Sequence, residues 1–440
     1  MAMVVKNNMS AISTLNTLNK NSSALSKSLA KVSSGMKINS AADDASGYAI
    51  SERMRVQIRG LDQANSNTQN GSSMMKVAEG AVSSTVDILK TLKEKVINAA
   101  NDSNTDSDRQ TIQKELDQSI DQIDDNANVT FNGKYLVDGS KNTVGSATAT
   151  ALTNQSLDVK TVGTSKLTDL KSRSGDKLEI ATTDKVTVSY VAGGKTYTST
   201  FSVGASTTLN DIFTKAEAVN TKDTIFKTGG ATATSTIGKA TSGATVHTAD
   251  GKSAITITAG TSGVSAQISG LTISITDQSG NVKKSANASL DAFNETIRAQ
   301  NKSADNAITL QVGTKANQSI KVGLTDMRSE ALGLKGSDGT KLNISTQDKA
   351  NAAINVLDNA VQKALDQQTT IGAVESRLEY TSSNLTTASE NVQSSESTIR
   401  DADMAKEMTN YTKNNVLLQA AQSMLSQANQ NSSSVLSLLK

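Results

Sequence analysis

Apolar residues recur at helical spacing at both ends of the chain, and this pattern constrains the fold more than any other feature. In residues 11–36 they follow one another every three or four positions, and the same spacing continues through residues 50–99. Positions three and four apart share one face of an α-helix, so both segments are predicted to be amphipathic helices. The uninterrupted heptads of the second segment predict a coiled-coil-like rod, roughly 75 Å long. Gly35 is expected to end the first helix, and Asp43 or Asp44 to cap the second.

The same spacing reappears near the C-terminus. A helix is expected to begin near residues 345–348, and its apolar row continues to Ile399. This segment matches the N-terminal rod in length, so we expect the two to pack as antiparallel rods, which brings the two termini together. The residues expected to pack between the rods are Ile50, Met54, Leu61, Leu89, Leu92, Ile354, Leu357, Val361, Leu378 and Leu385.

The composition supports long helices. The 440 residues include no proline, which would remove a helix hydrogen bond, and no tryptophan, with only 5 Phe and 6 Tyr. So few aromatic side chains indicate little material for a compact core. We therefore expect an elongated, helix-rich molecule.

The two extremities are predicted to need neighbours. No residue between Asn414 and Leu439 is charged, and apolar side chains occupy two adjacent rows of this segment. Ordering both ends costs roughly 100 kcal/mol of chain entropy, more than one pair of helices offsets at about 25 cal/mol per Å². We infer that the ends order on assembly into an open helical polymer of identical copies. The residues assigned to this assembly are Leu15, Leu18, Leu25, Leu29, Val32, Leu418, Met424, Leu425, Leu436 and Leu439.

The middle of the chain is predicted to be mostly β. A third helix is expected after residue 105, entered by a capping box from Ser107 to Gln110, and a hairpin should turn at Asn132-Gly133. Residues 139–306 then alternate short β-branched runs with Gly, Ser and Thr. The predicted fold class is mainly α, with long antiparallel helical rods from both termini and an inserted β-rich outer domain.

Several function classes are disfavoured. The chain has no Cys and one His, so no zinc site or thiolate nucleophile is expected, and no catalytic, metal or cofactor residues are assigned. His247 is interpreted as a strand or surface residue rather than a ligand. A formal charge of +2 argues against nucleic-acid binding, and no apolar run is long enough to span a membrane. The start of the chain has no cleavable signal pattern. Acidic pairs such as Asp401 and Asp403 are interpreted as helix caps or subunit contacts rather than a cation site.

Long motifs at both ends resemble bacterial flagellin, the subunit of the flagellar filament. The matching N-terminal segments include Ser33–Gly47, Ala49–Arg55, Gln57–Leu61, Ala78–Ala81 and Phe131–Gly133, and the C-terminal ones include Leu310–Gly313, Gly372–Tyr380, Ile399–Ala405 and Gln419–Asn429. The resemblance covers both ends and leaves the variable residues 139–306 without a recognisable motif.

The resemblance implies a layered tube that drives swimming. Residues 1–42 and 401–440 would form the inner layer, residues 43–138 and 307–400 the rod layer, and residues 139–306 the surface. It also implies export through the flagellar apparatus to the cell exterior, a chaperone at the C-terminal helix, a filament cap and hook-associated proteins as partners. A hook–filament junction protein and a filament subunit with an adhesive outer domain are the alternative functions, and no enzymatic role is expected.

Some flagellins activate a Toll-like receptor through the first rod and the helix after it, with the pattern Gln-Arg-Val-Arg-Glu-Leu. The corresponding face here is formed by Thr91, Lys93, Glu94, Lys95 and Glu115. Thr91 stands where the pattern has Arg, and Lys95 where it has Leu. Each change removes about 1 kcal/mol or more of contact energy, so we predict weak receptor activation.

Overall fold

The computed structural model describes residues 8–219, 225–227 and 230–438. Two units divide the chain. Residues 1–68, 311–318 and 380–440 form the first, and residues 69–310 with 319–379 form the second. Each unit therefore combines segments that are distant in the sequence, and the long helices α2 (Ala45–Ala99) and α6 (Gln347–Arg400) contribute to both.

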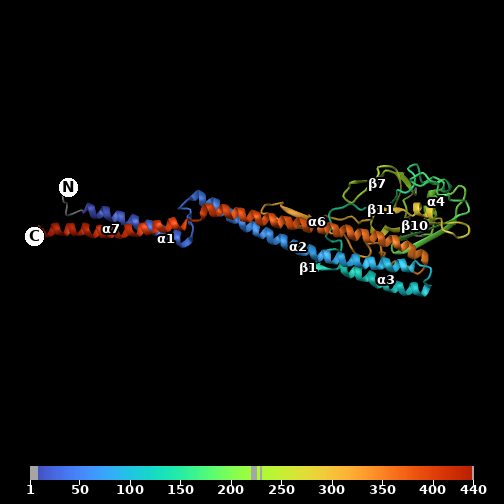
Figure 1. Ribbon diagram of the computed structural model, residues 1–440, viewed down its shortest axis with the longest axis horizontal. Coiled ribbons are helices and arrows are strands. Elements are labelled where there is room, and N and C mark those ends of the chain that lie inside the picture. The colour runs from blue at the N-terminus through green and yellow to red at the C-terminus, as the bar shows by residue number, and fades with distance from the viewer. Residues whose placement is uncertain (1–7, 220–224, 228–229, 439–440) are drawn as a thin grey trace. The chain divides into compact units, whose positions relative to one another are not determined.

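The first unit contains the two terminal helices, α1 (Met9–Ser34) and α7 (Met404–Leu438), which lie side by side (Figure 1). Asn8 Oδ1 caps α1 by accepting a hydrogen bond from Ala11 N at 3.0 Å. Gly35 ends α1 in the left-handed conformation, with φ 70°, as predicted from the sequence. Asp403 Oδ1 accepts from Ala405 N at 3.0 Å and so caps α7.

The two segments that link the terminal helices to α2 and α6 are hydrogen-bonded to each other. Lys37 N donates to Arg400 O at 2.7 Å, and Ala402 N donates to Gly35 O at 2.9 Å. The buried Arg400 guanidinium donates to Glu52 Oε1 at 2.5 Å and lies over the Tyr48 ring. These contacts hold both linkers together at one place in the first unit.

Apolar contacts and hydrogen bonds join α2 to α6 in the first unit. Leu61, Ala64 and Leu385 form one buried cluster. Ser382 Oγ donates to Asn65 Oδ1 at 2.6 Å beside this cluster. From Leu61 to Asn65 the numbers rise along α2, while those of their partners fall from Leu385 to Ser382 along α6. The two helices therefore pair antiparallel, as the sequence predicted.

The second unit holds the end of α2, the start of α6 and helix α3 (Asp106–Ala127). The predicted capping box at Ser107 and Gln110 is wrong. Thr105 is the N-cap, because its backbone is extended, whereas Ser107 already lies in the first helical turn. Asp108 N donates to Thr105 Oγ1 at 3.3 Å, and Thr105 N donates to Asp108 Oδ2 at 2.9 Å. The box is therefore present two residues earlier than the sequence suggested.

The expected hairpin follows α3. Strands β1 (Thr130–Phe131) and β2 (Lys134–Tyr135) pair antiparallel through a turn at Asn132 and Gly133. The φ angles of these two turn residues are 49° and 73°, the left-handed values that a two-residue hairpin turn requires. The predicted turn is confirmed.

The middle of the chain forms small antiparallel sheets that carry two short helices. The sheets have the orders β10-β4-β5, β11-β3-β9-β6, β7-β8 and β12-β13. The strand bounds are β3 (Ala151–Asn154), β4 (Lys185–Ala192), β5 (Lys195–Ser202), β6 (Thr232–Thr234), β7 (Thr236–Lys239), β8 (Thr245–His247), β9 (Ala254–Thr258), β10 (Ile268–Thr276), β11 (Phe293–Ile297), β12 (Ile308–Gln311) and β13 (Ser319–Val322). The helices are α4 (Leu209–Glu217) and α5 (Lys284–Leu290), and the 3₁₀ turns are Leu167–Asp169 and Val264–Ala266. Long helices at both ends with a strand-rich middle confirm the predicted fold class.

The few aromatic residues are concentrated in the core of these sheets. The Tyr190 and Phe226 rings are 5.2 Å apart between centroids, and Phe213 lies 5.9 Å from Phe226 and 6.1 Å from Phe293. Aliphatic side chains of β4, β9 and β10 complete this buried cluster. The expectation that the composition leaves little for a compact core is wrong for the second unit, because the scarce rings are gathered in one place.

Side chains satisfy the outer backbone groups of the edge strand β10. Asn355 and Asn359 of α6 donate from Nδ2 to Leu271 O at 3.0 Å and to Ser269 O at 2.9 Å. Farther along β10, Ile273 N donates to Asp291 Oδ1 at 3.1 Å. An edge strand with unpaired polar groups invites pairing with other chains. Here α6 and the residues after α5 occupy that edge, so the strand-rich region is joined to the long helix.

Burial of Asp291 makes the stability of this edge depend on pH. Burial raises the pKa of Asp291 from 3.8 to about 6. The folded state holds the proton more tightly, so this residue's contribution is full below about pH 4 and is lost as the pH rises through about 6. Asp291→Asn keeps an acceptor for Ile273 N without the buried charge. We expect it to raise the free energy of unfolding by roughly 2 kcal/mol at pH 7 and by little at pH 4 in urea titrations.

Asp277→Asn is the control with the opposite sign. Hydrogen bonds from the Asn281 side chain and backbone hold the pKa of the exposed Asp277 carboxyl below its usual range. Its contribution is present above about pH 4 and is lost below that, so this variant should lose stability at pH 7. If the free energy of unfolding depends on pH in the same way for the wild type and Asp291→Asn, protonation of the buried carboxyl is not coupled to folding.

Candidate assembly surface

The pair of terminal helices buries very little of itself. Among the described side chains of α1 and α7, only Ser28 and Ala421 are buried. Three amide hydrogen bonds connect the helices: Asn8 Nδ2 to Ala428 O at 3.1 Å, Asn21 Nδ2 to Leu417 O at 3.2 Å, and Asn414 Nδ2 to Ser28 Oγ at 3.1 Å. Small residues and amides thus form the contact, while most apolar side chains lie outside it.

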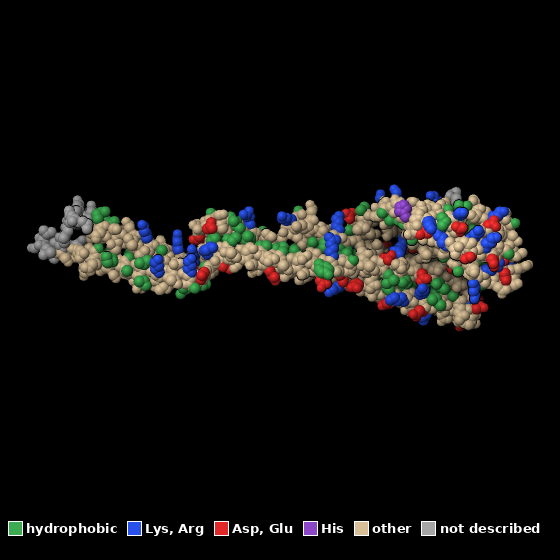
Figure 2. All heavy atoms as spheres, turned by 45° about the horizontal axis from the view of Figure 1, so that its top comes forward, with side chains coloured by type: hydrophobic (Ala, Val, Ile, Leu, Met, Phe, Trp, Pro, Cys, Tyr) green, Lys and Arg blue, Asp and Glu red, His purple; other side chains and the backbone are tan. Residues whose placement is uncertain are grey.

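Large apolar side chains of both helices face solvent in the single chain. Their exposed fractions range from 41% to 69%, and Figure 2 shows apolar patches along this part of the molecule. These residues are Met9, Ile12, Leu15 and Leu29 in α1, and Met404, Met408, Val416, Leu417 and Met424 in α7. Scattered exposed apolar residues are normal, but rows on two adjacent helices mark an interaction surface.

The residues assigned to assembly from the sequence fall into two groups. Leu18, Leu25, Val32, Leu418 and Leu425 are half-buried. Leu15, Leu29 and Met424 are exposed. The side chain of Leu436 and the whole of Leu439 lie outside the described residues. Their role in assembly stays a prediction.

Other exposed apolar residues were missed in the sequence. Met9 and Ile12 precede Leu15 at steps of three, and Val416 precedes Leu417. In α1 only the row that begins at Ala11 was followed, and in α7 Val416 lies outside the two rows that were recognised. A second row beside the first was the signal that could have found them.

The residues assigned to rod packing lie at or near the interior. Leu61, Leu89, Leu92, Leu357, Leu378 and Leu385 are buried, and Ile50, Met54, Ile354 and Val361 are half-buried. In the second unit Lys93 of α2 forms an ion pair with Asp358 of α6.

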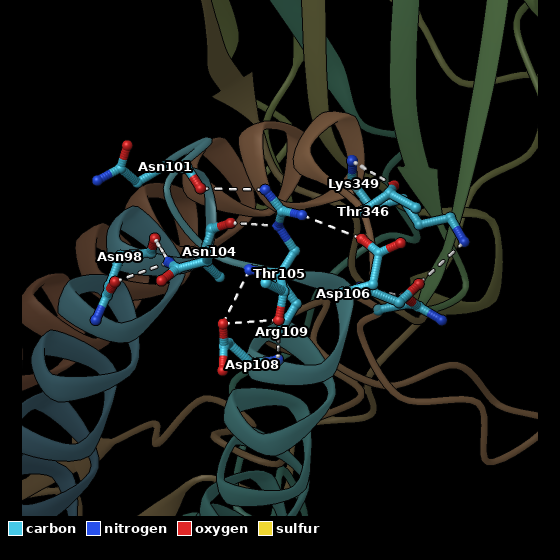
Figure 3. A network of polar contacts seen from close by, with 12 residues as sticks. Asn98, Asn101, Asn104, Thr105, Asp106, Asp108, Arg109, Thr346 and Lys349 are labelled. Atoms are coloured by element: carbon cyan, nitrogen blue, oxygen red, sulfur yellow. Dashed lines mark hydrogen bonds and ion pairs between the residues drawn. The ribbon is translucent and has the colours of Figure 1, made fainter.

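A buried arginine closes the turn between α2 and α3 (Figure 3). Arg109 points back from α3 and donates from Nε to Ala99 O at 2.9 Å and from a terminal nitrogen to Asn101 O at 3.1 Å. It also donates to Asp106 Oδ1 at 3.1 Å. Arg109 therefore satisfies the last carbonyl of α2, Ala99 O, and is a second donor to Asn101 O, which also accepts from Asn104 N at 3.3 Å. The start of α6, at Thr346 and Lys349, lies beside this network.

The face with the receptor pattern is partly occupied by ion pairs within the chain. Lys95 Nζ lies 2.8 Å from Glu115 Oε1, and Lys93 pairs with Asp358. Thr91 Oγ1 donates to Asp87 O at 3.0 Å, and Glu94 is exposed. A partner that needs Glu115 has to displace Lys95, a pair of exposed charges worth less than about 1 kcal/mol.

The described residues contain neither a metal-binding cluster nor a membrane-spanning helix. Among them, no group of three or more His, Asp or Glu side chains is placed to hold a metal ion. No helix in the described part of the chain is long and apolar enough to cross a membrane. His247 is exposed in β8, with Nδ1 at 3.4 Å from Thr236 Oγ1.

Paired terminal helices that leave their apolar rows in solvent define a self-assembling structural protein. Residues 5–142 match the family model for the bacterial flagellin N-terminal helical region, and residues 354–439 match the model for the C-terminal helical region. Flagellin from Clostridium tyrobutyricum is 36% identical over 97% of this chain and 99% of that protein, and flagellin from Bacillus subtilis (strain 168) is 30% identical over the full length of both. The solved structure of FliC from Burkholderia pseudomallei is 19% identical and covers 70% of this chain and 99% of that chain, with a TM-score of 0.26.

The chain belongs to the bacterial flagellin family. It is a structural subunit that polymerises into the flagellar filament, outside the cell.

Replacing Arg109 tests the closure of the turn. Arg109→Met should lower the free energy of unfolding by about 2–3 kcal/mol, because the buried carbonyl of Ala99 loses its donor and Asn101 O loses one of its two. Urea titration followed by circular dichroism measures this loss. Arg53→Met, at an exposed position of α2, is the matched control and should change stability by less than about 0.5 kcal/mol. Equal effects of the two variants would contradict the role of Arg109.

Proposed function

We propose that the exposed apolar rows of α1 and α7 are the surfaces through which copies of this flagellin polymerise. Residues 1–42 and 401–440 would pack between copies as the inner layer of the filament. Residues 43–138 and 307–400 form the rod layer, and residues 139–306 face the medium. The observation that carries this proposal is that α1 and α7 bury only Ser28 and Ala421 among their described side chains.

The energetics support packing between copies rather than within one. Each exposed Leu, Ile, Val or Met side chain gains about 1.5–3 kcal/mol when fully buried. Nine such residues on the two helices therefore supply on the order of 10 kcal/mol when neighbouring subunits cover them. Each copy has to offer and accept this surface, which makes the contact heterologous and lets the assembly grow. Ordering of the ends on assembly stays part of this proposal.

Transport partners are proposed for the same surface. Between Asn414 and Leu439 the chain has no charge, and Val416, Leu417 and Met424 are exposed. Such a helix needs cover before it reaches the filament, which supports a chaperone at α7 and export through the flagellar apparatus. The cap and hook-associated proteins would meet the same surfaces at the two ends of the filament. The role is structural rather than enzymatic, in keeping with the flagellin family.

Surface substitutions separate assembly from folding. Leu29→Ser and Met424→Ser change side chains that are 51% and 62% exposed in the single chain. They should leave monomer stability within about 0.5 kcal/mol and slow or abolish filament growth, measured by light scattering and electron microscopy. Val282→Ser, at a position 55% exposed within residues 139–306, is the matched control and should polymerise normally.

The outcome of these variants distinguishes the readings. Normal filaments from Leu29→Ser and Met424→Ser would contradict assembly through these rows. A strain without the protein should lack filaments, whereas filaments that are made but shed would favour a hook–filament junction role.

Receptor activation is proposed to be weak. The supporting contacts are the Lys95–Glu115 and Lys93–Asp358 pairs, together with the missing guanidinium at Thr91. Thr91→Arg with Lys95→Leu restores the agonist residues at these two positions and frees Glu115, so potency in a reporter-cell assay should rise roughly tenfold or more. Lys90→Arg, which leaves Thr91 and Lys95 in place, is the control. Full potency of the wild-type monomer would refute the proposal.

A further inference from the structure

A small cavity lies in the second unit between α6, the segment after β11 and the loop before residue 331. Its volume is about 150 Å³, room for several waters at about 30 Å³ each. The lining residues that matter here are Asn142, Asn301, Asp326, Arg328 and Lys363. We call it the Lys363 cavity.

The buried side chain of Lys363 places its ammonium group at this cavity. The residue is 7% exposed, and Nζ donates to Ala331 O at 2.6 Å. This is its only hydrogen bond among the described residues. An ammonium group has three N–H donors, so two remain without a protein acceptor at the cavity. Unsatisfied buried donors on a charged group are costly.

The nearby acids compensate Lys363 incompletely. Asp326 lies beside the cavity, but its carboxylate accepts hydrogen bonds from Arg328 at 2.6 and 3.0 Å. The Glu295 side chain of β11 is buried, and burial raises its pKa above the usual range, while the Arg298 and Lys363 charges act against that rise. The Arg298 guanidinium also faces Glu295, with Nε at 3.7 Å from Oε2.

The remaining charges leave the site positive. Asp366 of α6 is engaged by Arg298 at 2.6 Å. Burial lowers the pKa of Lys363, and the nearby Glu295 and Asp326 carboxyls act in the opposite direction. On the lining, the basic residues Lys302, Arg328 and Lys363 lie with one acid, Asp326, and Glu330 and Asp138 also act on Arg328.

The neutral side chains of the lining present donors rather than acceptors. Asn301 Oδ1 accepts from Val264 N at 3.0 Å, and Asn142 Oδ1 accepts from Thr143 N at 2.9 Å. With both amide oxygens used by the backbone, the two NH₂ groups are left to face a ligand. Arg328 adds a guanidinium held by Asp326.

We propose that the Lys363 cavity binds a small oxyanion, a phosphate-sized or carboxylate-bearing molecule. The anion accepts the two spare N–H groups of Lys363 and the amides of Asn142 and Asn301, and it supplies the negative charge that Glu295 and Asp326 do not. Binding joins α6 to the segment after β11 and to the loop before residue 331, so it stabilises the second unit. The site is independent of the assembly surface on α1 and α7.

Binding is measured on the full chain, in dilute solution, with inorganic phosphate as the probe. Phosphate replaces chloride at constant ionic strength, and both the unfolding temperature and the ³¹P line width are recorded. We expect a saturable rise in the unfolding temperature and broadening of the phosphate line. Sulfate and acetate in place of phosphate distinguish a tetrahedral oxyanion from a carboxylate as the preferred group.

Two variants test the assignment to this cavity. Lys363→Met should abolish the saturable part of both signals. Asn301→Asp keeps the acceptor for Val264 N but exchanges a donor for a negative charge, so it should weaken binding roughly tenfold or more even if Lys363→Met fails to fold. Lys321→Met, whose ammonium is 59% exposed and pairs with Asp305, is the control and should bind as the wild type does.

Two results of these binding measurements would contradict an anion site in the Lys363 cavity. No saturable effect in the wild type would overturn it. A saturable effect that persists unchanged in Asn301→Asp, or in a folded Lys363→Met, would place the anion elsewhere and would also overturn it.

Discussion

The antiparallel pairing of α2 with α6 is the interaction on which the rest of the structure depends. The two helices come from opposite ends of the sequence, so every contact between them closes a long stretch of chain. Leu61 with Leu385 in the first unit and the Lys93–Asp358 pair in the second unit hold this register. Arg400 holds the end of α6 to α2 in the first unit, and Arg109 holds the end of α2 to α3 in the second.

The strand-rich region depends on α6 as much as on its own core. Asn355 and Asn359 are one helical turn apart, and they bond to carbonyls of alternate residues on β10. Gly270 lies between those carbonyls, where a Cβ atom would lie 2.8 Å from the Val356 side chain and 3.1 Å from Ala352 O. The helix therefore approaches the strand closely only because Gly270 has no side chain. A variable domain inserted into a family of helical proteins can change its surface freely while this edge stays covered.

Sequence patterns predicted the features that depend on local chemistry. The stop at Gly35, the turn at Asn132-Gly133 and the paired helices follow from conformational freedom and apolar periodicity. The capping box was misplaced because Thr105-x-x-Asp108 and Ser107-x-x-Gln110 both fit the pattern, and only the backbone at residue 105 decides between them. The Asn355 and Asn359 contacts and the position of Lys363 had no signal in the sequence, since their partners come from distant segments. For the candidate assembly surface, two apolar rows were recognised on the C-terminal helix but only one on the N-terminal helix, so Met9 and Ile12 were missed.

The two units of the protein differ in how much apolar surface they bury within a single chain. In the strand-rich core the scarce aromatic rings are buried within the single chain, so this region gains its stability before assembly. In α1 and α7 one partner helix is too small to cover all the apolar side chains. Amides such as Asn21 and Asn414 hold the pair in register, and each of these hydrogen bonds adds little to the free energy of folding. A subunit that satisfied these helices alone would have no reason to polymerise. Under the proposed assembly, the apolar side chains of the terminal helices stay exposed in the single chain, and their burial between copies supplies the free energy of assembly. The second unit keeps each copy folded until the copies meet.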